Sequence, residues 1–103
     1  MRVLIKTKNF KISPEMKKMI DEKFSGLIKF NSSISDIRVE IEHDAHHLKG
    51  EVLRCEANIL FNGNMVRVEK WSNSFDKSVN KVKDHLKVIL SKERKKILAS
   101  KRR

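Results

Sequence analysis

The residues best suited to chemistry in this sequence are the lysines and arginines of its last quarter. Residues 77–103 carry eleven basic side chains against two acidic ones, Asp84 and Glu93, so this segment holds +9 of the chain's net charge of +11. Such an excess raises the local concentration of polyanions, and each phosphate that is contacted releases counterions. The composition predicts a surface for nucleic acid or an anionic membrane, with a charged face that serves solubility alone as the alternative.

The spacing of these charges fits the outer surface of one helix. On a helical wheel at 100° per residue, they surround a single apolar stripe made of Phe75, Val79, Val82, Leu86, Ile89, Leu90 and Ile97. Few acids lie four residues away, so like charges repel by roughly 0.2–0.5 kcal/mol per pair. Tolerance of this repulsion favours a role in phosphate contacts.

Lysines of an earlier predicted helix, Lys17, Lys18, Lys23 and Lys29, extend the basic surface if the two helices lie side by side. The predicted RNA-binding residues are Lys8, Lys23, Lys29, Lys77, Lys81, Lys83, Lys87, Lys92, Arg94, Lys95 and Lys96. The sequence has no zinc-finger spacing, helix-turn-helix pattern, heptad basic region or aromatic RNP motif, which disfavours base-specific DNA recognition. Shape-directed binding to structured RNA is the remaining class.

Other reactive residue types are few. His43, His46 and His47 form an H-x-x-H-H cluster, but it lacks a cysteine or clear fourth ligand, so we predict solvated histidines and no metal site. Cys55 alternates with core positions and is predicted to be a buried structural thiol. We expect Trp71 to pack in the core or at its rim, with stacking on a base as the alternative.

Catalysis has no set of residues to support it. The sequence contains no glycine-rich phosphate loop, no Ser-His-Asp order and no pair of carboxylates placed for acid–base work, so we predict neither an enzyme nor a cofactor or small-molecule substrate. No apolar run reaches the roughly 18 residues of a membrane span, and the first residues do not form a secretory signal. We expect a cytoplasmic protein, and the single cysteine agrees with a reducing compartment.

At 103 residues the chain fits one domain. We assign residues 1–98 to a single α+β domain and residues 99–103 to a basic, flexible C-terminal end. Apolar alternation predicts strands over residues 2–7, 37–42, 51–61 and 65–71, with the last two joined by a type I′ turn at Asn62-Gly63.

Two helices complete the pattern. Ser13 as N-cap and Pro14 at the first helical position start one at residues 14–29. Ser72 or Asn73 caps a second, over residues 74–98. Met16, Met19 and Met65 fall on apolar stripes and are predicted to be core. The order β-α-β-β-β-α indicates a two-layer α+β sandwich, a four-stranded sheet with both helices on one face.

Taken together, these features resemble a known family. Five features occur in the same order as in the bacterial ribosome hibernation promoting factors and ribosome-associated inhibitors. They are a first strand that ends in a "KN" turn, the helix start at Ile12, Ser13 and Pro14, the residues Lys23, Phe24 and Leu27, the Asn62-Gly63 hairpin and the lysine-rich last helix. The resemblance covers nearly the whole chain. It implies a dsRBD-like fold of the short form, without the C-terminal dimerisation domain of the long forms.

The resemblance also implies a partner. Proteins of this kind bind the 30S subunit or 70S ribosome at 16S rRNA, in the channel of mRNA and the A- and P-site tRNAs, where they block translation and preserve idle ribosomes. Whether a separate ribosome modulation factor acts with this chain stays open, and we expect a monomer off the ribosome.

The sequence departs from the family in the second helix. Where the family has Asp-Met-Tyr, this sequence has Ser74, Phe75 and Asp76. Further along the helix, the stretch that begins at His85 and Leu86 lacks two polar residues that the family uses for contacts. A protein-interaction module that docks through an open sheet face is the alternative function. A membrane-surface protein is disfavoured because the last helix has no aromatic residue on its apolar side beyond Phe75.

Overall fold

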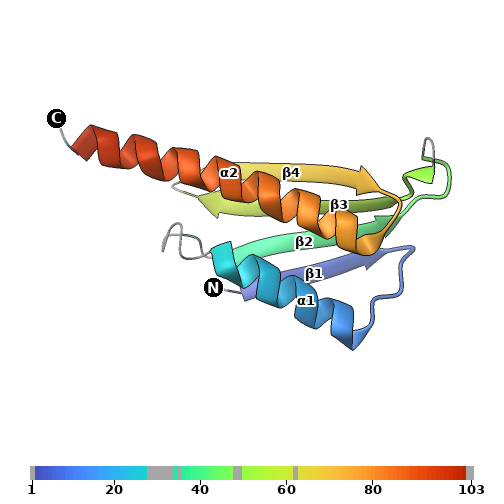
Figure 1. The fold of residues 1–103 in the computed structure, drawn as a ribbon. Coiled ribbons are helices and arrows are strands. Elements are labelled where there is room, and N and C mark those ends of the chain that lie inside the picture. Colours follow the sequence, from blue (N-terminus) through green and yellow to red (C-terminus); the bar gives the residue numbers. More distant parts are fainter. Residues whose placement is uncertain (1, 28–33, 35, 48–49, 62, 102–103) are drawn as a thin grey trace.

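The chain folds as a two-layer α+β sandwich. The computed structural model describes residues 2–27, 34, 36–47, 50–61 and 63–101, with the side chains of the last helix described as far as Lys92. The elements are β1 (Arg2–Lys8), α1 (Pro14–Ser25), β2 (Asp36–His43), β3 (Leu53–Phe61), β4 (Asn64–Ser72) and α2 (Phe75–Lys101). Both helices cover the same face of the sheet (Figure 1), as the sequence predicted.

The four strands lie side by side in chain order. β1 pairs with β2 in parallel, because α1 carries the chain back across the sheet between them, while β2–β3 and β3–β4 are antiparallel. Alternation along each strand sends one set of side chains under the helices and the other onto the opposite face, which no element covers in the described part of the chain (Figure 1). We call that second surface the open sheet face.

Local chemistry fixes the start of α1. The Ser13 hydroxyl accepts a hydrogen bond from the Met16 N–H at 3.1 Å, Pro14 occupies the first helical turn, and Glu15 lies at the positive end of the helix dipole. The helix ends at Ser25 with Gly26 as its C-cap, four residues earlier than predicted. Residues 28 and 29 of the predicted helix lie outside the described residues.

The β3–β4 hairpin has the two-residue turn that the sequence predicted. Phe61 pairs with Asn64 on either side of it, and Gly63 has a φ of +77°, in the left-handed region that this turn requires of its second residue. Asn62 lies outside the described residues. β3 begins at Leu53, two residues later than expected.

The N-cap of α2 is Ser74, so the prediction of Ser72 or Asn73 was wrong. The Ser74 hydroxyl accepts from the Lys77 N–H at 3.3 Å, whereas the buried Ser72 hydroxyl is used elsewhere, since it donates to the Ser74 carbonyl at 2.7 Å. Ser78 then anchors the first turn of the helix to the sheet by donating to the Leu53 carbonyl at 2.7 Å. The helix continues to Lys101, three residues past the predicted end.

A single core lies between the sheet and the helices. The largest fully buried side chains come from both layers: Phe24, Ile20, Ile37, Ile41, Ile59, Leu86, Leu90, Val39, Val79 and Val82. Cys55 is buried, as predicted, and burial raises the pKa of its thiol to about 12. Met16 and Met19 pack against the core, but Met65 is 65% exposed, because its position in β4 faces the open side of the sheet.

Candidate nucleic-acid interface

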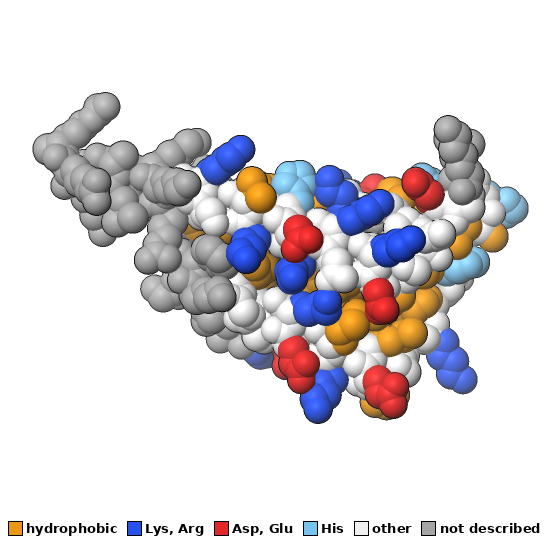
Figure 2. Space-filling view, viewed as in Figure 1, with side chains coloured by type: hydrophobic (Ala, Val, Ile, Leu, Met, Phe, Trp, Pro, Cys, Tyr) orange, Lys and Arg blue, Asp and Glu red, His pale blue; other side chains and the backbone are white. Residues whose placement is uncertain are grey.

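The basic side chains of α2 lie on the exposed part of the helix, together with Asp84 and Val88. Phe75, Val79, Val82, Leu86 and Leu90 are buried against the sheet. The remaining circumference of the helix carries Lys77, Lys81, Lys87 and Lys92, all exposed, and the half-buried Lys83. Figure 2 shows lysine and arginine side chains gathered along α2 and in the space between the two helices. We call these five lysines the α2 basic face.

One contact links this surface to α1. The ammonium group of Lys23 donates a hydrogen bond to the side-chain oxygen of Asn80, across the space between the helices. Lys23 therefore lies next to the α2 basic face, as the sequence predicted for helices that lie side by side. α1 as a whole carries no net charge, because Lys17, Lys18 and Lys23 are matched by Glu15, Asp21 and Glu22.

Little within the described chain neutralises the α2 basic face. Its one ion pair joins Lys83 to Asp84 at 3.4 Å, and exposed pairs of this kind contribute roughly 0–1 kcal/mol. Lys81 donates to the Trp71 carbonyl at 3.2 Å, which leaves its charge uncompensated. The positive field of this helix is thus available to an external anion.

Other predicted site residues lie elsewhere. Lys8 is on the open sheet face, where its ammonium group lies 3.6 Å from the Glu42 carboxylate, so the sheet separates it from the α2 basic face. Lys29 lies outside the described residues. Arg94, Lys95 and Lys96 belong to the helical backbone of α2, beyond the side chains that the structure describes.

The sequence reasoning missed a charged cluster on the open sheet face, near the start of β3. Arg54 is only 7% exposed, and its guanidinium donates to four carboxylates from three strands: Glu40, Glu42 at 2.7 Å, Glu56 at 2.6 Å and Glu69 at 3.3 Å. Burial alone would lower the pKa of Arg54, but the hydrogen bonds and charges of Glu42 and Glu40 raise it above its ordinary value. We call this set the Arg54 cluster.

Arg67 joins the edge of the cluster. It donates to Glu56 at 3.0 Å and to Glu69 at 3.3 Å. Desolvation by burial raises the pKa of Glu56, but hydrogen bonds from Asn58 and Arg67, with the charges of Arg67 and Arg54, bring it below its ordinary value. The available signal in the sequence was the alternation of Arg54 and Glu56 with core residues. It indicated that one side of this strand faces solvent, but not that its charged side chains form ion pairs with other strands.

The histidine loop packs on the tryptophan. The rings of His47 and Trp71 are parallel within 2° with centroids 3.5 Å apart, so Trp71 packs at the rim of the sheet with one ring face covered. His46 belongs to a turn in which its N–H donates to Asp44. Among the described residues, no group of three or more potential ligands is placed to hold a metal ion.

No helix in the described part of the chain is long and apolar enough to cross a membrane. The fold and its surface define a small β-α-β-β-β-α domain with one strongly basic helix opposite an open sheet face.

The family follows from comparison with known proteins. Residues 3–98 match the family described as Sigma 54 modulation protein / S30EA ribosomal protein, so the chain belongs to this family of ribosome-associated proteins. No curated protein matches the sequence significantly.

Solved structures share the fold. The Protein Y N-terminal domain of Thermus thermophilus superposes with a TM-score of 0.74 at 18% identity, over 89% of this chain and 98% of that one. A ribosomal subunit interface protein from Coxiella burnetii gives 0.73 at 20% identity, over 90% and 97%. The predicted resemblance and the predicted fold are thereby confirmed.

Proposed function

We propose that this protein is a ribosome hibernation factor. It binds 16S rRNA of the small subunit in the channel used by mRNA and the A- and P-site tRNAs, inhibits translation and stabilises inactive ribosomes. The observation that carries the proposal is the α2 basic face in a chain of the S30EA family. Of its five lysines, only Lys83 forms an ion pair within the described part of the chain, and that pair is weak.

The chemistry of this binding is electrostatic. Lysine ammonium groups contact phosphates as point charges and release counterions, which needs no base-specific geometry. Lys23 adds a contact from α1, and Arg94, Lys95 and Lys96 are proposed to extend the surface along the same helix. The protein inhibits translation by occupying the channel, which requires no enzymatic activity, cofactor or small-molecule substrate. It acts in the cytoplasm and is a monomer off the ribosome.

Sedimentation with purified ribosomal particles tests the proposal. The protein is mixed with 30S, 50S and 70S particles at low and high salt, with and without P-site tRNA. We expect it to pellet with 30S and 70S but not with 50S, to be released at high salt, and to compete with tRNA. Absence from every particle at low salt would overturn the proposal, and binding unaffected by tRNA would overturn the assignment to the channel.

A further inference from the structure

The open sheet face has the composition of a contact surface. Four large hydrophobic side chains are exposed among the described residues, and three of them lie here: Leu4 at 38%, Leu60 at 47% and Met65 at 65%. Leu60 and Met65 face each other on β3 and β4 beside the hairpin, and Leu4 lies on β1, separated from them by Arg38 and Asn58. Grouped exposed apolar residues on a soluble domain mark interaction sites more often than single ones do.

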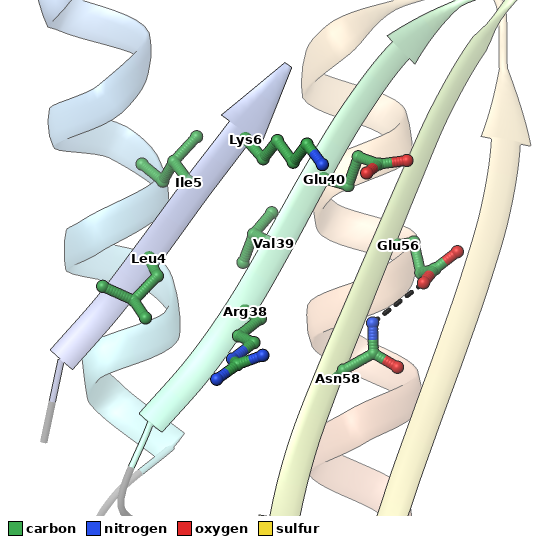
Figure 3. Close-up of a pocket in the computed structure, with 8 residues that line it drawn as sticks. All are labelled: Leu4, Ile5, Lys6, Arg38, Val39, Glu40, Glu56 and Asn58. Atoms are coloured by element: carbon green, nitrogen blue, oxygen red, sulfur yellow. Dashed lines mark hydrogen bonds between the residues drawn. The ribbon is translucent and has the colours of Figure 1, made fainter. Parts of the chain in front are cut away.

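Two depressions meet in this region. One, of about 370 Å³, is bordered by Leu4 and Lys6 of β1, Arg38 and Glu40 of β2, and Glu56 and Asn58 of β3 (Figure 3). The other, of about 180 Å³, is bordered by Asp36, Arg38, Asn58, Leu60 and Met65. Arg38 and Asn58 border both, so an occupant of this region would contact the Arg38 guanidinium together with apolar side chains.

The charges around these depressions are not equally available. Glu40 and Glu56 are bound by Arg54, and Asp36 lies 3.6 Å from Arg2. Arg38 and Lys6, in contrast, have no carboxylate within ion-pair distance in the described part of the chain, although Lys6 points over β2 toward Glu40 (Figure 3). The two charged groups beside these depressions that lack an ion-pair partner are therefore both positive.

We propose that the open sheet face docks a short protein segment that carries an acidic residue beside apolar ones. A carboxylate of the segment pairs with Arg38 and Lys6, while its apolar side chains cover Leu4, Leu60 and Met65. Four strands of about eight residues give a face roughly 19 Å by 26 Å, and the two depressions take up only part of it. This size suits a short segment better than a globular domain.

Two other occupants fit less well. RNA would leave the exposed Leu60 and Met65 side chains without apolar partners. A second copy docked face to face would bring Arg38 toward Arg38 between chains that each carry +11. The proposal does not depend on ribosome binding, since it concerns the opposite side of the sheet.

Selection from a display library of random short peptides on the full chain tests the proposal. The selected peptides are then titrated against three proteins: wild type, Lys6→Gln/Arg38→Gln, and Lys81→Gln/Lys87→Gln. The last variant loses the same charge from the α2 basic face and controls for non-specific attraction of acidic peptides. All affected side chains border solvent-facing depressions or are exposed, so the variants keep the core intact.

We expect enriched peptides to carry Asp or Glu next to Leu, Ile, Phe or Met. Their affinity falls about tenfold in the Lys6→Gln/Arg38→Gln variant, as charge-assisted hydrogen bonds are lost, and less than about twofold in the α2 variant. Met65→Ser lowers affinity by a smaller factor without changing the preference for acidic residues.

Three results would overturn the proposal. One is the enrichment of basic peptides, and another is the absence of any peptide whose affinity depends on Lys6 and Arg38. The third is concentration-dependent dimerisation in sedimentation velocity that Met65→Ser abolishes, which would assign the open sheet face to a second copy of the chain.

Discussion

The α2 side of the molecule and the open sheet face carry the same kinds of charged residues but differ in how far these residues are paired. Between Phe75 and Lys92, α2 presents five lysines with two aspartates. The open sheet face carries six basic residues (Arg2, Lys6, Lys8, Arg38, Arg54 and Arg67) and five acidic ones (Asp36, Glu40, Glu42, Glu56 and Glu69), most of them in ion pairs.

The difference between the two sides comes from backbone geometry. Strand pairing places side chains of neighbouring strands about 4.5–5.5 Å apart, so opposite charges on a sheet meet directly. Residues around a helix meet only at three- and four-residue spacing, and α2 has few acids at those positions. Charged side chains on the open sheet face are therefore mostly paired with one another, whereas the lysines of α2 are available to a partner.

The largest expected effect is on the sheet side. Arg54→Ala leaves four carboxylates around a vacated site that was almost closed to water, and loss of one partner from a buried ionic network costs about 3–5 kcal/mol. Urea titration of the variant and the wild type at neutral pH measures this loss of unfolding free energy.

A control for this prediction is Arg67→Ala, which removes an exposed arginine from the same carboxylates and should have a clearly smaller effect. If Arg54→Ala is as mild as Arg67→Ala, the Arg54 cluster contributes no more than surface ion pairs, and the contrast between the two sides is lost.

A pH dependence should follow from the same cluster. The pKa of Glu56 in the folded protein is below its ordinary value of 4.5, so its contribution to stability is present above that value and is lost as the pH falls through the lowered folded pKa. Urea unfolding of the wild type between pH 6 and about pH 3 should show this loss.

The Arg54→Ala variant serves as the comparison for the pH experiment. Acid protonates Glu56, whose pKa is lowered in part by the charge of Arg54, so the stability difference between the variant and the wild type should shrink as the pH falls. A constant difference across this range would contradict the assignment of the carboxylates to Arg54.

On the helix side, the expected effect is on binding rather than on folding. Lys87→Ala should lower the slope of log affinity for 30S particles against log salt by about one unit, because one phosphate contact is lost. Stability should change by no more than about 0.5 kcal/mol, since the side chain is exposed.

Lys8→Ala is the matched control for Lys87→Ala. Lys8 is also an exposed lysine, but it is paired with Glu42 on the open sheet face. An equal loss of slope in both variants would place RNA on both sides of the sheet.

A local effect is expected at the end of the open sheet face, where His47 packs on Trp71. His47→Ala uncovers one ring face of Trp71, the only tryptophan in the chain, so its fluorescence emission should shift to longer wavelength. Unfolding free energy should fall by about 0.5–1.5 kcal/mol, the range for a stacked ring pair. Unchanged emission would mean that the stack is not formed in solution.

The sequence predicted the elements better than their ends. Alternation in β2 and β3, the Ser13-Pro14 helix start and the Gly63 turn act through neighbouring residues, and each was predicted correctly. The end of α1 and the cap of α2 were misplaced. For α2, the reason is that Ser72, a good cap by type, is buried and bonded within the turn that leads to Ser78.

The candidate site was predicted unevenly for a similar reason. Helical periodicity alone assigns the lysines of α2 to one surface, and Lys23 was correctly expected beside it. Lys8 was also predicted to bind RNA, but strand pairing places it against Glu42 on the other side of the sheet. Met65 follows an apolar pattern, yet its register opposite Leu60 puts it in solvent.

By itself, then, the sequence determined the order of strands and helices and the concentration of positive charge on α2, because both depend on short-range periodicity and composition. Only the tertiary structure decided which charges remain available. Arg54 meets carboxylates from β2, β3 and β4, and residues so far apart in the chain come together only once the sheet has its register. The same register exposes Leu4, Leu60, Met65 and Arg38 together, which no local pattern could indicate.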